Sequence, residues 1–183
     1  MNKRLEILMT VLLAVLVSSC HQEAPLRDCD AKALLLDKDY LLLDRFVVSD
    51  YYFESPSSQA PPESASYSFY INNDVVGNSV FRYKYIDQAI DFYKSRERNE
   101  FRATEAEGPW EWSEGMPSVE IHAQQYSLGC GNFYSERRCN FIARYDEYYV
   151  SFQAAISEQG LSVQDFGRGV NQIDSQIVAC INK

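Results

Sequence analysis

Few side chains in this sequence have the types and spacing that catalysis needs. The two histidines are His21, near the N-terminus, and His122, in a stretch with a strand-like pattern, so a histidine-based triad would depend on His122. Paired carboxylates could act as acid and base on a glycoside. The nearest such pairs are Glu105 with Glu107 and Glu111 with Glu114. A hydrolase is therefore an alternative, while a non-catalytic domain is the leading expectation.

The glycine patterns of common catalytic and nucleotide sites are missing from the sequence. A nucleophile elbow needs Gly-x-Ser-x-Gly, and the nearest match, Gly77-Asn78-Ser79, lacks the second glycine. The phosphate-binding patterns Gly-x-Gly-x-x-Gly and Gly-x-x-x-x-Gly-Lys do not occur either. Gly129 and Gly131 flank Cys130 and fit turn positions. We therefore expect no catalytic residue and no bound cofactor.

The cysteines carry the clearest chemistry, and the 5 of them divide into one plus four. Cys20 ends the apolar N-terminal segment, whereas Cys29, Cys130, Cys139 and Cys180 lie in the remainder. In an oxidising compartment an even set predicts disulfides. The alternative is a metal site, but no Cys-x-x-Cys or Cys/His spacing of the zinc type is present. We therefore expect two disulfides and no metal.

Spacing favours one pairing of these four cysteines. Cys130 and Cys139 bracket a polar segment at the ends of two strand-like runs, so a bridge there would close a hairpin. The remaining pair, Cys29 and Cys180, would join the two ends of the domain and enclose nearly all of it. Closing the longer loop would constrain the unfolded chain more strongly.

The N-terminal segment has the pattern of an export signal. Lys3 and Arg4 precede an apolar run over Ile7–Val17, and the small pair Ser18-Ser19 follows. Such an order is typical of a cleaved signal peptide. A membrane-spanning helix needs about 20 apolar residues, so the shorter run predicts a signal over residues 1–19 and not a permanent anchor.

The residues Val17-Ser18-Ser19-Cys20 resemble the lipobox of bacterial lipoproteins, although Val17 stands where leucine is usual. The resemblance implies cleavage before Cys20, acyl chains on Cys20 and a place on the extracytoplasmic side of a membrane. His21 follows where the family's inner-membrane retention signal is an aspartate, which implies the outer membrane in a cell with two membranes. The alternative is an ordinary secretory peptide that leaves Cys20 as a free thiol.

The charge of the chain argues against nucleic acid as a partner. The formal net charge is −9, and removal of residues 1–19, with two basic residues and one acidic residue, would change it to −10. Nucleic-acid binding requires clustered basic side chains, whereas the one tight cluster, within residues 96–102, is interleaved with carboxylates. The expected partners are a membrane, through the lipid, and an envelope protein or glycan.

Aromatic side chains are the one compositional excess, with 13 Tyr, 10 Phe and 2 Trp. Tyrosine and tryptophan combine an apolar face with a polar tip, which suits sugar stacking and protein interfaces. Trp110, Trp112 and Tyr148 are the candidate recognition surface, and its candidate neighbours are Tyr51, Tyr52 and Tyr149. The favoured alternative is that these rings fill a β-rich core. A carbohydrate- or peptidoglycan-binding protein is therefore the second functional hypothesis.

Strand-like runs would have to position these residues. We expect them at Leu41–Phe53, Tyr67–Ile71, Ser79–Tyr85, Val119–Leu128 and Asn140–Ala155. Asp146-Glu147 should split the last run at a turn, and residues 72–78, rich in Asn and Gly, should join a hairpin. Residues 54–66, with several prolines and serines, predict a loop.

Two longer segments predict amphipathic helices. The first covers Asp87–Ala103. The second begins with the capping-box pair Ser162 and Asp165 and repeats apolar residues at intervals of three and four. These are Val163, Phe166, Val170, Ile173, Ile177 and Ile181. Both helices should pack on the sheet.

The expected fold is therefore α+β, an antiparallel sheet with two main helices packed on it, one of them C-terminal. After the signal and a tether over residues 20–28, residues 29–183 should form one domain. The order of elements resembles the small α+β domains of the PsbP and Mog1 type, which occur on exported and lipidated bacterial proteins. That resemblance implies no site residues.

Overall fold

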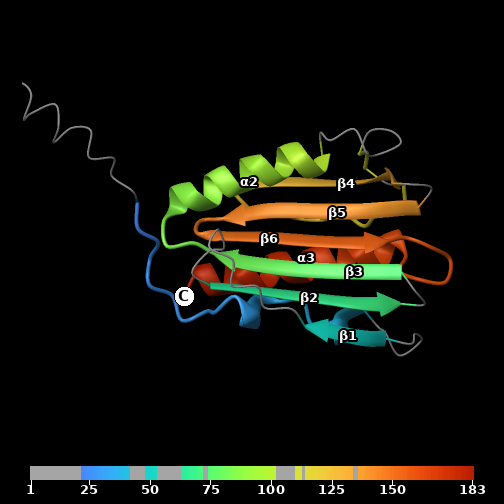
Figure 1. The fold of residues 1–183 in the computed structure, drawn as a ribbon, viewed down its shortest axis with the longest axis horizontal. Coiled ribbons are helices and arrows are strands. Elements are labelled where there is room, and N and C mark those ends of the chain that lie inside the picture. Colours follow the sequence, from blue (N-terminus) through green and yellow to red (C-terminus); the bar gives the residue numbers. More distant parts are fainter. Residues whose placement is uncertain are drawn as a thin grey trace, which may run out of the picture.

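The structure is a computed structural model, and it describes residues 22–41, 48–52, 63–71, 74–101, 110–112, 114–133 and 136–183. The predicted signal and Cys20 lie outside these residues. An antiparallel six-stranded sheet with the order β1-β2-β3-β6-β5-β4 forms the centre (Figure 1). The strands are β1 (Val48–Tyr52), β2 (Glu63–Ile71), β3 (Asp74–Arg82), β4 (Gln125–Phe133), β5 (Glu136–Tyr145) and β6 (Tyr148–Ala155).

Helices cover both faces of the sheet. In Figure 1, α2 (Ile86–Phe101) crosses in front of β4 and β5, and α3 (Val163–Ile181) lies behind the sheet. Two 3-10 helices, η1 (Lys32–Leu34) and η2 (Lys38–Leu41), contact α3. In the described part of the chain no helix has the length and apolar character needed to span a membrane.

Alternation along the central strands explains the two covered faces. Phe141 and Ala143 of β5 belong to the core cluster beneath α3, whereas Ile142 between them packs with Ala89 and Tyr93 of α2. Successive side chains of a strand point to opposite faces, so a strand with helices on both sides can bury consecutive residues, as β5 does from Cys139 to Tyr145. The predicted α+β class with two packed helices is confirmed.

The C-terminal helix follows the sequence prediction closely. The Ser162 side chain accepts from the Asp165 backbone N–H, and the Asp165 side chain accepts from the Ser162 N–H. Both glycines of the first turns are packing sites: a Cβ on Gly167 would lie 2.6 Å from Pro117, and one on Gly169 would lie 2.8 Å from Phe152. Close approach of the helix to its neighbours therefore requires glycine at both positions.

The strands extend further into the predicted turns and loops than the sequence indicates. Ile71 pairs with Asp74, so β3 begins inside the segment expected to be a turn, and β2 begins at Glu63, inside the expected loop. Likewise, β4 and β5 continue past Cys130 and Cys139 as far as Phe133 and Glu136. Backbone pairing with the neighbouring strand outweighs the turn preference of single residues, because each strand residue gains a partner for its polar groups.

Candidate functional site

The segment after the predicted signal is attached to the domain. Ala24 N–H donates to the Lys84 carbonyl at 2.9 Å, Ile86 N–H donates to the Gln22 carbonyl at 3.0 Å, and Glu23 forms an antiparallel bridge with Tyr85. These residues extend the sheet pattern beyond the end of β3. Residues 22–24 of the predicted tether therefore form a docked strand-like segment in the structure.

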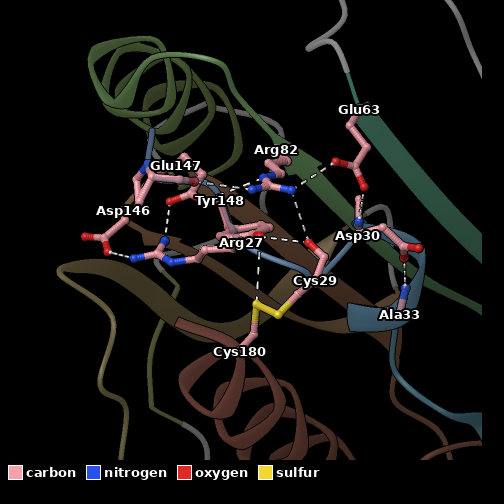
Figure 2. Close-up of a disulfide and its surroundings, with 12 residues drawn as sticks. Arg27, Cys29, Asp30, Ala33, Glu63, Arg82, Asp146, Glu147, Tyr148 and Cys180 are labelled. Atoms are coloured by element: carbon pink, nitrogen blue, oxygen red, sulfur yellow. Dashed lines mark hydrogen bonds and ion pairs between the residues drawn. A yellow bond between two sulfur atoms is a disulfide. The ribbon is translucent and has the colours of Figure 1, made fainter. Parts of the chain in front are cut away.

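The Cys29–Cys180 disulfide joins this segment to the end of α3 (Figure 2). Tyr148 lies beside the bond, and its hydroxyl donates to the Cys29 carbonyl at 2.8 Å. The Arg82 guanidinium lies 5.4 Å from the centre of the Tyr148 ring, within the range of a cation–π contact. Burial raises the pKa of Tyr148 to about 12, so its hydroxyl remains a donor at neutral pH.

Two arginines and several carboxylates surround the disulfide in Figure 2. Arg27 donates to Asp146 at 2.8 Å and to Glu147. Arg82 lies 3.6 Å from a carboxylate oxygen of Glu63 and 3.6 Å from one of Glu147. The side chain of Glu147 is 0% exposed, so this carboxylate relies on the two guanidinium groups for charge compensation.

Burial and charge act in opposite directions on these groups. Burial raises the pKa of Glu147, and the nearby Arg27 and Arg82 only partly offset that effect. Burial lowers the pKa of Arg27, but its bonds to Asp146 and Glu147 outweigh it and leave the pKa above the usual value. The Arg27 guanidinium therefore keeps its charge, and Glu147 takes up a proton at a higher pH than an exposed glutamate would.

A cavity of about 550 Å³ opens beside this cluster. Its lining residues are Glu23, Ala24, Pro25, Leu26, Arg27, Glu63, Arg82, Tyr83 and Lys84. Within the described residues, the Arg82 guanidinium donates to the carbonyls of Pro25 and Cys29 at 3.4 Å each, which is long enough for its donors to be shared with a bound molecule. Three cations and two carboxylates in one lining suit a small polar molecule that carries both signs of charge.

The structure does not assemble the predicted aromatic surface. Tyr148 is 0% exposed, so its assignment to a recognition surface is wrong. The reason is that β6 is a central strand with α3 on one face and α2 on the other, which leaves no solvent side for either Tyr148 or Tyr149. The side chains of Tyr51 and Tyr52 lie outside the described residues.

The two tryptophans lie near the other end of the sheet from this cluster. Glu111, between them, pairs with Cys130 of β4. Trp110 is partly covered, with its ring 5.3 Å from that of Phe101, whereas Trp112 is 54% exposed. Among the predicted recognition residues whose side chains the structure describes, only Trp112 therefore presents a largely open aromatic face.

Both cysteine pairs favoured by the sequence are bonded. In addition to Cys29–Cys180, Cys130 and Cys139 lie directly opposite each other on β4 and β5 and form the second disulfide. No group of three or more His, Cys, Asp or Glu side chains among the described residues is arranged to hold a metal ion.

Comparison with known proteins yields distant similarities to solved structures. No family model matches the chain, and no curated protein matches it. Among solved structures, the chain is similar to the extracellular domain of PknH from Mycobacterium tuberculosis, at 11% identity and a TM-score of 0.47, over 85% of this chain and 99% of that one. A Mycobacterium smegmatis protein described as the Rv0999 ortholog is similar at 10% identity and a TM-score of 0.36, over 79% of this chain and 97% of that one.

The one histidine in the described residues bonds to a buried carboxylate. Asp174 of α3 accepts from the His122 backbone N–H at 2.8 Å, from His122 Nδ1 at 2.7 Å and from the Tyr145 hydroxyl at 2.7 Å. The His122 side chain is 53% exposed, and its Nε2 lies 3.7 Å from the Glu120 carboxylate. A serine-type triad needs a hydroxyl at Nε2, and the described chain places a carboxylate on that side.

Sequence reasoning missed the buried charges at both of these places. Asp174 had a readable signal, because it lies between Val170 and Ile177 on the apolar stripe of the last helix, where an acid must be buried. Arg27 and Glu147 had no comparable signal. They meet only because the chain before Cys29 passes the β5–β6 turn, which is a tertiary contact.

Proposed function

We propose that this chain is a lipoprotein of a bacterial cell envelope, anchored through acyl chains on Cys20, whose domain binds an envelope component without catalysis. The signal over residues 1–19 would be removed before the protein reaches its membrane. In a cell with two membranes, His21 after the cysteine favours the outer one.

The division of the cysteines carries this proposal. Four of the five are bonded in two disulfides, which proteins of oxidising compartments form and keep. The remaining cysteine is Cys20, at the lipidation position of the pattern Val17-Ser18-Ser19-Cys20. An export signal and oxidised cysteines thus point to the same side of the membrane.

Intact mass spectrometry of the protein purified from membranes of its native host tests the anchor. We expect a mass that lacks residues 1–19 and includes acyl chains, with four further cysteines labelled only after reduction. A Cys20→Ser variant is the matched control and should carry no acyl chains. An unacylated mature protein with a reactive Cys20 thiol would show instead that this is a soluble secreted domain.

A glycan-binding function is the second candidate, because Trp112 is 54% exposed. Exposed indole rings stack on sugar faces through their large apolar area. A glycan and peptidoglycan array should then show binding that Trp112→Ala abolishes and that Tyr126→Ala, a change at another exposed ring, preserves. Equal signals from the unaltered protein and Trp112→Ala would exclude Trp112 from any sugar site.

A further inference from the structure

Very little chain separates Cys20 from the folded domain. Gln22 is already fixed, because its carbonyl accepts from the Ile86 N–H at the start of α2 at 3.0 Å. Two extended residues span at most about 7 Å, far less than the roughly 30 Å thickness of the hydrocarbon layer. A lipid on Cys20 would therefore hold this end of the domain at the membrane surface.

The docked segment is fastened along its length. Ala24 bonds to the Lys84 carbonyl at 2.9 Å, Arg27 bonds to Asp146 at 2.8 Å, and Cys29 is covalently joined to α3. The hydrogen bonds and ion pairs of residues 22–28 would have to break before these residues could act as a flexible spacer, and Cys29 would still be held by its disulfide. The distance between lipid and domain is therefore set by the fold.

Leu26 lies within this segment and points fully into solvent. Its relative exposure is 103%, the largest of the exposed apolar side chains in the described residues. Arg27, next to it, is held by two carboxylates, and the carbonyl of Pro25 accepts from Arg82 at 3.4 Å. Single exposed leucines are common on protein surfaces, but this one is six residues after Cys20, on the segment that the lipid would hold at the bilayer.

We infer that the surface formed by Gln22–Leu26 and Lys84, the anchor face, lies against the bilayer with the Leu26 side chain inserted at its surface. This orientation rests on the proposed acylation of Cys20. Lys84 fits the same place, because its side chain is 61% exposed and a lysine can keep its ammonium group among lipid headgroups while its methylenes lie deeper.

The anchor face fixes the direction of the whole domain. β3 ends beside it, α2 starts there, and the β5–β6 turn contacts Arg27. The strands run away from this end, so the β4–β5 hairpin tip and the start of β3 lie at the opposite end (Figure 1). Trp112, which follows the bridge between Glu111 and Cys130, would then face away from the membrane.

Depth-dependent quenching of a thiol probe tests this orientation. In Leu26→Cys, a bimane group would be attached to the only free thiol of the acylated, disulfide-bonded protein in vesicles of phosphatidylethanolamine and phosphatidylglycerol with brominated acyl chains. Val75→Cys is the matched control, because Val75 is also an exposed apolar residue, at 39%, and lies at the far end of β3. We expect loss of most of the bimane emission at position 26 and no loss at position 75.

Failure of the orientation and failure of the anchor give different results. Acylated protein in which both probes are quenched equally, or neither is quenched, would overturn the orientation and leave the lipoprotein proposal standing. A mass without acyl chains in the same preparation would overturn both. Quenching at position 75 alone would show that the domain is anchored with its other end toward the bilayer.

Discussion

At the scale of single residues, Asp174 connects three parts of the molecule. Its carboxylate accepts from the backbone and ring of His122 and from the hydroxyl of Tyr145. The irregular chain before β4, the end of β5 and the middle of α3 therefore meet at one buried group. A buried carboxylate with three donors is well compensated, because each donor replaces a lost water contact.

His122 should make stability depend on pH. Its bond and charge interaction with Asp174 raise its pKa above the usual 6.5, so the folded state holds the proton more tightly than the unfolded state. The stabilisation is fully present below about pH 6.5 and is lost as the pH rises through the folded-state pKa. Glu120 faces the same ring and adds to the effect. Urea unfolding of the unaltered protein and His122→Gln over a pH series should show a difference that shrinks with rising pH, and a constant difference would contradict this role.

Glu147 should be costly to leave without Arg27. Arg27→Ala removes its closest cation while the carboxylate stays buried, and breaking a buried pair in this way costs about 3 kcal/mol. The free energy of unfolding of Arg27→Ala should therefore fall by about that amount. Adding Glu147→Gln should recover part of the loss, because a neutral amide is easier to bury. If the stability losses of the single variants Arg27→Ala and Glu147→Gln simply add in the double variant, the two residues are not coupled.

At the scale of elements, the last helix was predictable because its signals are local. Ser162 and Asp165 form the expected cap, and the apolar stripe is buried against the sheet. The predicted β5–β6 turn is also confirmed. Asp146 adopts a positive φ of 49° there, a conformation that Asp and Asn adopt more readily than most residues. The position of Tyr148 was not predictable, because alternation alone cannot show that both faces of a strand are covered.

The ends of the strands and the docking of residues 22–24 could not be predicted from the sequence for a related reason. The backbone groups of residues 22–24 bond to Lys84–Ile86 and not to any neighbour in sequence. Composition identified this segment as a polar tether, and its polar side chains do remain exposed. The segment pairs with the chain just after β3, so its structure depends on where β3 ends.

Gly169 tests how closely α3 approaches the sheet. Alanine favours helices by about 1 kcal/mol over glycine, but its Cβ would lie 2.8 Å from Phe152. Overpacking of this kind costs about 1 to 3 kcal/mol, so Gly169→Ala should lower the midpoint of thermal unfolding. Gln164→Ala, at an exposed position of the same helix, should change the free energy of unfolding by less than about 0.5 kcal/mol. An increase in stability with Gly169→Ala would mean that the helix can shift away at no cost.

At the scale of the whole molecule, the two disulfides should contribute unequally. Cys29 and Cys180 are 151 residues apart and Cys130 and Cys139 are 9 apart, and loop-closure entropy grows with that separation. On the chain-entropy relation the long bridge contributes about 5 kcal/mol and the short one about 2.5 kcal/mol. Urea unfolding of the two paired Cys→Ala variants should therefore show the greater loss for the Cys29/Cys180 pair, and equal losses would indicate that residual structure in the unfolded chain already brings its ends together.

The covalent link at Cys29 also limits how far the molecule can stretch. A pulling force applied ahead of Gln22 would first peel residues 22–28 away from Lys84 and the β5–β6 turn, where the contacts are hydrogen bonds and ion pairs. Those seven residues extend by about 25 Å at most. The force would then pass through the Cys29–Cys180 bond directly into the end of α3. Pulling from the N-terminal side would therefore not unfold the central strands one after another. Residues 22–28 can therefore extend under force, and the Cys29–Cys180 disulfide limits that extension.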